Sequence, residues 1–222
     1  YLEGTLVKRM RIDVLGVGFD NLTMEEAVDE GMRLINEPGP HYVVTPNPEI
    51  VEVCREDAAA NRAVNGADLV IPDGIGVIYG AKILGTPLKQ KLPGIEFAAC
   101  LMQRMAAEKK SLYLLGAKPG VAELAAEKLR ETYPGLIIAG THDGSFQDDE
   151  PMADVVFVCL GAPKQEKWME QNGAATGAHL LLGLGGSLDV FAGVVQRAPE
   201  IFTKTGMEWF SPLLKQPSRI GR

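Results

Sequence analysis

Asp73 is the residue best suited to acid–base chemistry, in the run Ile-Pro-Asp-Gly-Ile-Gly. It follows an apolar run and precedes a glycine-rich stretch that we expect to be helical, so its carboxylate could enter a ligand crevice as a general base. A Pro-Asp-Gly sequence is also a common tight turn, in which the Asp side chain bonds its own backbone. The residues alone leave both interpretations open.

Asn47 and Thr45 follow another apolar run. Asn followed by Pro is a strong helix start, with Asn47 as N-cap and Pro48 at the first helical position. Capping is the simpler interpretation, and Thr45 would then only end a strand. The two roles are compatible, because a capping side chain at the carboxyl end of a strand also faces the crevice where ligands bind.

Glycine turns supply a second set of candidates. The run Gly116-Ala-Lys-Pro-Gly120 lies between an expected strand and an expected helix, where backbone N–H groups and the helix dipole favour an anion such as phosphate. The spacing is not G-x-G-x-x-G, and no acidic residue ends the next apolar run, so a nicotinamide cofactor is disfavoured. A tight turn needed only for packing explains Gly116 equally well.

Gln165 and Asp189 complete the candidates. Gln165 lies in the first turn of a helix after a Gly-Ala-Pro segment, close to where a phosphate would dock, although a charged helix start is usually a solvated face. Asp189 follows the pair Gly185 and Gly186 and could accept hydrogen bonds from ribose or sugar hydroxyls. Its alternative role is that of a first-turn acid that stabilises a helix.

Several chemistries are disfavoured by composition. The histidines (His41, His142 and His179) lie far apart, without a partner at metal-ligand spacing, so we expect no metal and no cofactor. Neither a G-x-S-x-G nor a Walker pattern occurs. The 3 scattered cysteines indicate a reducing compartment rather than a disulfide framework. The formal net charge of −7 argues against nucleic acid as a partner.

The elements that must position these residues form a repeated pattern of an apolar run, a turn and a helix. The apolar runs are residues 42–45, 68–71, 112–115, 155–160 and 180–184. They are continuous rather than alternating, which is typical of parallel strands buried on both faces. We therefore predict an α/β, Rossmann-like open sheet, mainly parallel, with helices on both faces. Its loops at the carboxyl ends of the strands would hold the candidates.

The chain divides by charge near its end. We predict one Rossmann-like domain over residues 1–196 and a C-terminal helical segment over 197–222. That segment holds five basic residues against two acidic ones, and its apolar side chains suggest contact with a membrane or a partner subunit. These apolar residues are Phe202, Trp209, Phe210, Leu213 and Leu214; core packing is an equally good explanation for the first two.

The order and spacing of seven short runs resemble the WecG/TagA/CpsF glycosyltransferases from about Arg11 to Pro217. The most specific runs are Gly161-Ala-Pro-Lys-Gln-Glu-Lys-Trp168 and Arg197-Ala-Pro199. The others are Thr45-Pro-Asn-Pro-Glu-Ile-Val51, Pro72-Asp-Gly74, Leu114-Leu-Gly116, Gly140-Thr-His-Asp-Gly144 and Gly183-Leu-Gly-Gly-Ser-Leu-Asp189.

This resemblance implies an inverting, metal-independent hexosyltransferase. It would move N-acetylmannosamine, or a related sugar, from a UDP-sugar to polyprenyl-diphosphate-linked N-acetylglucosamine, in teichoic acid or other surface polysaccharide synthesis. We expect a cytoplasmic protein bound peripherally to the inner face of the cell membrane, and a homo-oligomer is possible. The alternatives are a non-catalytic UDP-sugar-binding member and another nucleotide-dependent Rossmann-like enzyme, such as a methyltransferase or dehydrogenase.

The resemblance also implies residue roles. Asp73 matches the family's base, Thr45 and Asn47 match residues that line the sugar and acceptor pocket, and Gln165 matches a polar residue near the diphosphate or sugar. Asp189, with Gly185 and Gly186, matches a loop on the nucleotide side.

Three departures from the family pattern qualify this match. Lys91 stands where the family usually has an Arg that would stabilise the leaving group, and Lys offers a point charge rather than a bidentate fork. The crossover around residues 147–152 is shorter than in the family, which leaves two alternatives open: a stunted crossover or missing residues. The chain also stops at Arg222, where the family usually continues.

Overall fold

A six-stranded parallel sheet forms the centre of the molecule. The computed structural model describes residues 11–144 and 153–195. The strand order is β4-β3-β8-β7-β5-β6, and each neighbouring pair is parallel. The strands are β3 (His41–Val44), β4 (Leu69–Val70), β5 (Ser111–Gly116), β6 (Ile137–His142), β7 (Val155–Cys159) and β8 (Leu180–Gly183). The predicted α/β fold class is confirmed.

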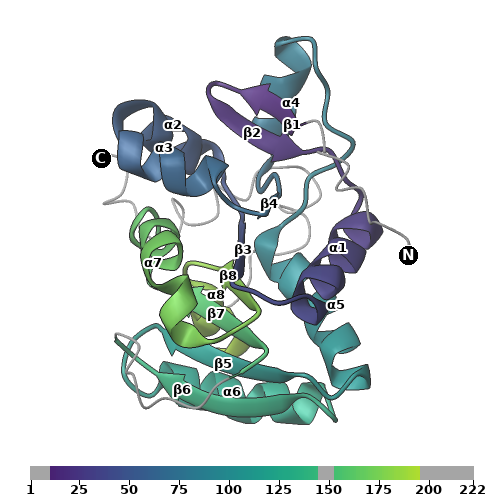
Figure 1. Ribbon diagram of the computed structural model, residues 1–222, viewed down its shortest axis with the longest axis vertical. Helices are drawn as coiled ribbons and strands as arrows, with labels where there is room; N and C mark the ends of the chain where they lie inside the picture. Colours follow the sequence, from purple (N-terminus) through teal and green to yellow (C-terminus); the bar gives the residue numbers. More distant parts are fainter. Residues whose placement is uncertain (1–10, 145–152, 196–222) are drawn as a thin grey trace.

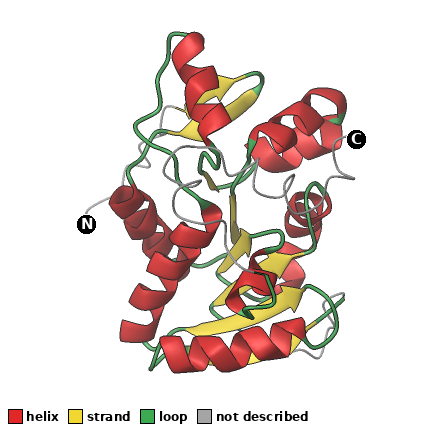
Figure 2. Cartoon of the chain, turned by 180° about the vertical axis from the view of Figure 1, so that it is seen from behind, coloured by secondary structure: helices red, strands yellow, loops and turns green. Residues whose placement is uncertain are grey.

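Helices cover both faces of this sheet (Figures 1 and 2). One face packs against α1 (Met24–Asn36), α5 (Gly94–Ala107), α6 (Val121–Thr132) and α8 (Ser187–Phe191). The other packs against α2 (Pro48–Glu56), α3 (Ala58–Asn65), α4 (Ile75–Ile83) and α7 (Lys164–Asn172). A short 3-10 helix, Gly173–Thr176, follows α7.

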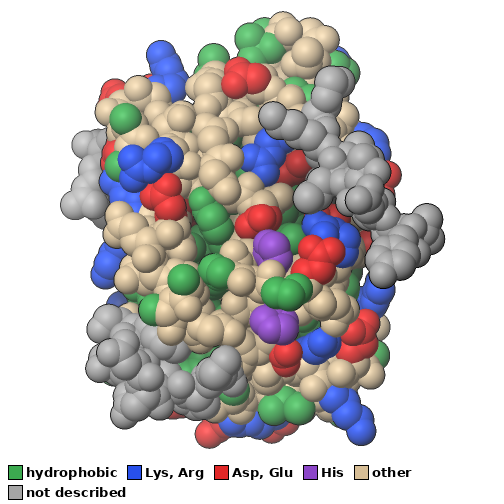
Figure 3. All heavy atoms as spheres, viewed as in Figure 1, with side chains coloured by type: hydrophobic (Ala, Val, Ile, Leu, Met, Phe, Trp, Pro, Cys, Tyr) green, Lys and Arg blue, Asp and Glu red, His purple; other side chains and the backbone are tan. Residues whose placement is uncertain are grey.

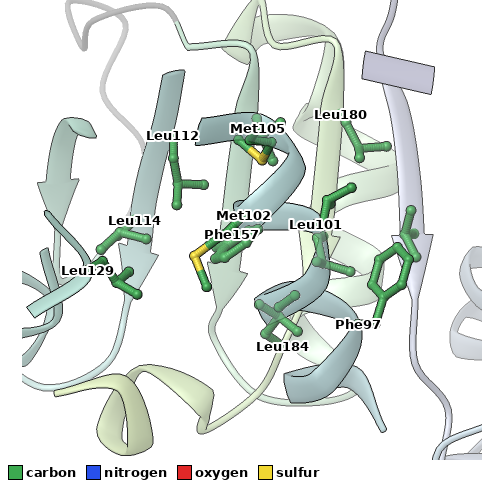
Figure 4. Packing of buried hydrophobic residues seen from close by; sticks show 14 of the residues in the cluster. Phe97, Leu101, Met102, Met105, Leu112, Leu114, Leu129, Phe157, Leu180 and Leu184 are labelled. Atoms are coloured by element: carbon green, nitrogen blue, oxygen red, sulfur yellow. The ribbon is translucent and has the colours of Figure 1, made fainter. Parts of the chain in front are cut away.

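The helices on both faces of the sheet explain why the strand sequences are continuously apolar. Successive residues of a strand point to opposite faces, so Phe157 joins the core under α5 while Val158 joins the core under α7. Figure 4 shows Met102 of α5 next to Phe157 of β7, and Phe97 and Leu101 of α5 belong to the same buried cluster. Phe157 is fully buried, and burial of a side chain of this size contributes roughly 1.5–3 kcal/mol.

Two helices begin at capping residues, of which Asn47 was predicted. Thr23 and Glu26 form a capping box, with Oε2 of Glu26 2.7 Å from the backbone N of Thr23. Asn47 caps α2 by accepting a 2.9 Å hydrogen bond from the N–H of Ile50, and Pro48 occupies the first helical turn. Both interactions satisfy backbone donors that a helix start leaves without partners.

An antiparallel hairpin precedes the sheet and was not predicted. It consists of β1 (Arg11–Val14) and β2 (Val17–Asp20), joined by Leu15 and Gly16 at φ angles of 54° and 88°. The buried carboxylate of Asp20 accepts a 2.8 Å hydrogen bond from the N–H of Val70 in the edge strand β4. The hairpin therefore covers the end of the sheet farthest from α6, as Figure 1 shows.

Two predictions concern segments outside the described residues. These are the shortened crossover at 147–152 and the C-terminal segment at 197–222, with its aromatic and basic side chains. Within residues 11–144 and 153–195, no helix is long and apolar enough to cross a membrane. On the face drawn in Figure 3, acidic and basic side chains are interspersed.

Candidate active site

Asp73 lies just beyond the carboxyl end of β4, and two backbone contacts fix its place. Its N–H donates a 3.1 Å hydrogen bond to the carbonyl of Pro46, which follows β3. Its Oδ2 accepts a 3.1 Å hydrogen bond from the N–H of Gly94, the first residue of α5. Asp73 is half-buried, so its carboxylate is held by a helix N-terminus at the rim of the sheet.

Thr45 and Asn47 lie beside Asp73. A Cβ on Gly74 would lie 3.9 Å from the Cβ of Asn47, so the turn after Asp73 packs against the start of α2. A Cβ on Gly94 would lie 3.0 Å from the Oγ1 of Thr45. The structure therefore brings Thr45, Asn47 and Asp73 into one group at the ends of β3 and β4, which we call the carboxylate group.

Lys91 lies on the same side. It is half-buried and precedes Leu92, whose N–H donates a 2.8 Å hydrogen bond to the carbonyl of Pro72. This hydrogen bond places the segment before α5 alongside the turn that carries Asp73. Lys91 therefore belongs beside the carboxylate group.

A cleft of about 380 Å³ opens at the same carboxyl-end rim of the sheet, at the ends of β5, β6, β7 and β8. Three predicted residues, Gly185, Gly186 and Asp189, line it. Its remaining lining residues are Ala117, Asp143, Cys159, Leu160, Gly161 and Lys164. These residues lie at or after the carboxyl ends of β5, β6, β7 and β8, the edge at which open α/β sheets bind ligands.

Sequence reasoning missed Lys164 and Asp143 as cleft residues. Lys164 begins α7 and was interpreted with its neighbours as a solvated helix start. Asp143 directly follows β6, and its place after a strand in the Gly140–Gly144 run was a signal that could have identified it. Among the described residues, the cleft thus presents one ammonium group and two carboxylates.

Gly116 serves packing rather than the cleft itself. It is buried at φ 111°, and a Cβ there would overlap the carbonyl of Cys159 on the neighbouring strand. Its neighbour Ala117, at φ 69°, lines the cleft. Because β5 is four strands from β4 and three from β3, Gly116 is separated from the carboxylate group by roughly 14–19 Å of sheet at ordinary strand spacing.

Gln165 lies between the carboxylate group and the cleft, but beneath the surface. Only 2% of it is exposed, and it is not among the cleft's lining residues. Its Oε1 accepts a 2.9 Å hydrogen bond from the N–H of Gly185, and its Nε2 donates a 2.9 Å hydrogen bond to the Oε1 of Glu166. Thr45 joins this region by donating from Oγ1 to the carbonyl of Gly183 at 3.3 Å.

The electrostatics of the cleft disfavour nucleophilic sulfur chemistry. Burial raises the pKa of the Cys159 thiol to about 12, with a further contribution from the nearby charge of Asp189, so the thiol stays protonated at neutral pH. Burial also raises the pKa of Glu166, although the hydrogen bond from Gln165 acts in the opposite direction. Over residues 11–144 and 153–195, no group of three or more His, Cys, Asp or Glu side chains could hold a metal ion.

Comparison with known proteins agrees with the family resemblance. The model of the "Glycosyl transferase WecG/TagA/CpsF family" matches residues 12–222. Three relatives from Staphylococcus aureus, of strains MW2, MRSA252 and NCTC 8325 / PS 47, are each named N-acetylglucosaminyldiphosphoundecaprenol N-acetyl-beta-D-mannosaminyltransferase. Each is 34% identical to this chain over 96% of the chain and 87% of the relative. The chain therefore belongs to the WecG/TagA/CpsF family of glycosyltransferases.

Proposed function

We propose that this glycosyltransferase moves N-acetylmannosamine, or a related sugar, from UDP to polyprenyl-diphosphate-linked N-acetylglucosamine. The names of the Staphylococcus aureus relatives support both the sugar and the acceptor. The observation that carries the proposal is the position of Asp73. Its carboxylate is held at the same rim of the sheet as a cleft of about 380 Å³.

The reaction follows as a single displacement. Asp73 accepts the proton of the acceptor hydroxyl, and the resulting oxygen attacks the anomeric carbon of the donor sugar. The bond from that carbon to the diphosphate oxygen breaks as the new bond forms, and UDP leaves with the electron pair. Because attack and departure occur on opposite faces of the sugar ring, the configuration inverts.

The cleft suits the nucleotide part of the donor. Asp189 would accept hydrogen bonds from ribose hydroxyls, while Lys164 and the N-terminus of α7 would lie near the diphosphate. A leaving diphosphate gathers negative charge, and fixed cations and backbone dipoles can stabilise it without a metal ion. Metal independence and a UDP-linked donor are therefore part of the proposal, as is the contribution of Lys91 to leaving-group stabilisation.

We also propose a peripheral position at the inner face of the cell membrane. The acceptor named for the relatives is a lipid diphosphate, which resides in a membrane. The enzyme must then approach a membrane surface to reach its substrate. Association into a homo-oligomer stays a prediction.

Transfer to a synthetic lipid-diphosphate-N-acetylglucosamine, assayed with a panel of UDP-sugars and read by mass spectrometry, tests this function. We expect a product with one added N-acetylhexosamine, formed equally well in the presence of a chelator. UDP binding without transfer to any acceptor in the panel would favour the non-catalytic alternative. Tighter binding of S-adenosylmethionine or NAD than of UDP would favour a different nucleotide-dependent enzyme.

Replacement of Asp73 isolates the chemical step. Asp73→Asn keeps an oxygen that can accept from Gly94 but removes the base, so we expect transfer to fall by at least about 100-fold while UDP binding is kept. Asp29→Asn is the matched control, because Asp29 forms an exposed ion pair with Arg104 far from the rim. Near-normal turnover of Asp73→Asn would contradict the assignment.

A further inference from the structure

Glu166 is a buried carboxyl group that the proposed mechanism does not use. It lies in the first turn of α7, is 1% exposed, and does not line the cleft. Its Oε1 accepts the hydrogen bond from Gln165, while its Oε2 is buried without a hydrogen-bond partner in the described part of the chain. Burial of a carboxyl group with incomplete hydrogen bonding is costly, so its presence calls for a compensating role.

The role we infer begins with the polarity of the Gln165 amide. A glutamine amide has an acceptor oxygen at one end and a donor nitrogen at the other. Here the nitrogen faces Glu166 and the oxygen faces the N–H of Gly185, each at 2.9 Å. In the flipped amide, two acceptors would face each other at Glu166 and two donors at Gly185. The carboxyl group of Glu166 therefore fixes which end of the amide reaches Gly185.

The Gly185–Gly186 turn depends on that contact. Gly185 has a φ of 53°, and a Cβ placed on it would meet nothing within 4 Å, so side-chain packing does not hold the turn from that side. The Gln165 side chain lies close against Gly183, where a Cβ would be 3.1 Å from its Nε2. The hydrogen bond from Gly185 to Gln165 thus ties the turn to the buried side chains below it.

We propose that Glu166 is a positioning residue that orients the Gln165 amide and, through it, the Gly185–Gly186 turn that forms one wall of the nucleotide cleft. The effect on nucleotide binding rests on the proposed function. The effect on the Gly185–Gly186 turn is independent of that function, because it follows from the two hydrogen bonds of Gln165 and the burial of Gln165 and Glu166. Glu166 itself does not touch the donor.

Three variants separate this role from simple packing. Glu166→Gln keeps an acceptor oxygen of the same size, whereas Glu166→Met fills similar space without any acceptor. Glu170→Met is the matched control, because Glu170 lies on the same helix but pairs with Arg62 instead. Two measurements apply to each variant: hydrogen exchange of the Gly185 amide by NMR, and the Kd for UDP by calorimetry.

The expected results differ by variant. In Glu166→Met the Gly185 amide exchanges faster and the Kd for UDP rises by about tenfold, the equivalent of roughly one hydrogen bond. In Glu166→Gln, the Gly185 exchange rate and the Kd for UDP stay within about threefold of the values for the original chain. Glu170→Met changes neither quantity. Gln165→Met removes both hydrogen bonds of Gln165, so it should cause the same faster Gly185 exchange and the same rise in Kd as Glu166→Met. The double variant Gln165→Met/Glu166→Met should be no worse than either single variant.

Two outcomes would overturn the inference. The first is unchanged Gly185 exchange and UDP affinity in a folded Glu166→Met protein. The second is an equal loss in Glu166→Gln and Glu166→Met, which would indicate that an ionised carboxylate or its packing matters instead. If Glu166→Met does not fold, Glu166→Gln and Gln165→Met still decide between these outcomes. Failure of the original chain to bind UDP would count against the proposed function, while the Gly185 exchange would still test the positioning role.

Discussion

The N–H of Gly94 donates a 3.1 Å hydrogen bond to Oδ2 of Asp73, and this contact joins the start of α5 to the end of β4. The two residues are 21 positions apart in the sequence, with all of α4 between them. The donor is one of the four N–H groups that a helix start leaves without an intrahelical partner. The contact therefore satisfies the helix and aims the carboxylate at the same time.

Gly94→Ala tests whether the hydrogen bond between Gly94 and Asp73 requires the close approach of Thr45 to the start of α5. A Cβ would lie 3.0 Å from both Oγ1 and Cγ2 of Thr45, so either Thr45 or the start of α5 must shift. We expect a loss of about 1–3 kcal/mol in the free energy of unfolding, together with a clear fall in kcat. Denaturant unfolding and the transfer assay measure the two effects. Gly173→Ala is the control, since its Cβ would make only ordinary contacts at 3.4 Å or more, and a kcat equal to that control would contradict the prediction.

Gly116→Ala tests the packing role of the glycine turn. The substitution combines a φ of 111° with an overlap against the carbonyl of Cys159, so we expect at least about 3 kcal/mol of destabilisation. Gly85→Ala provides the comparison, because Gly85 has a φ of 82° but open space around its Cβ, and only the conformational cost of about 1 kcal/mol applies. Equal effects in urea unfolding would show that the close approach of β5 and β7 is unimportant.

Lys91 is expected to act as a fixed positive charge beside the carboxylate group. Lys91→Met should lower kcat for transfer by at least about tenfold, because the charge that develops on the leaving group loses a stabilising partner. Lys91→Arg keeps the charge and should retain most activity. Lys89→Met is the matched control, since Lys89 forms an exposed ion pair with Glu26 at 2.7 Å. A kcat for Lys91→Met within twofold of the control would remove Lys91 from the mechanism.

Stability should fall at alkaline pH because of the buried thiol of Cys159. Its pKa is raised from 9.0 to about 12 in the folded chain, so above pH 9 the unfolded chain holds fewer protons than the folded one. The free energy of unfolding then decreases by up to about 1.4 kcal/mol per pH unit between pH 9 and pH 12. Cys159→Ala should flatten this slope, whereas substitution of the exposed Cys100 to Ala should not. Identical slopes in urea titrations would contradict the prediction.

Much of the fold could be predicted because its signals are local. Apolar runs without alternation required strands covered on both faces, and Asn47 marked the start of α2 through its capping chemistry. The position of Asp73, Gly185 and Asp189 at one rim then followed from the parallel arrangement of the strands. These inferences use only neighbouring residues and one rule of sheet topology.

The features that could not be predicted depend on contacts distant in sequence. The first turn of α7 carries four consecutive polar residues, and nothing in the sequence indicated that Gln165 and Glu166 face the core while Lys164 faces the cleft. The β1–β2 hairpin has strands of four residues each, too short for a clear alternation. Its place at the sheet edge is set by Asp20, which bonds Val70, 50 positions away.

The tie between Asp20 and Val70 has a consequence for shortened versions of this enzyme. Strand β4 is only two residues long, and Asp73 follows it by three positions, so the β1–β2 hairpin helps to align the carboxylate that we propose as the base. Deleting that hairpin would expose the unpaired edge of β4 to other chains and loosen the turn that holds Asp73. A chain without the hairpin should therefore both lose turnover and tend to aggregate.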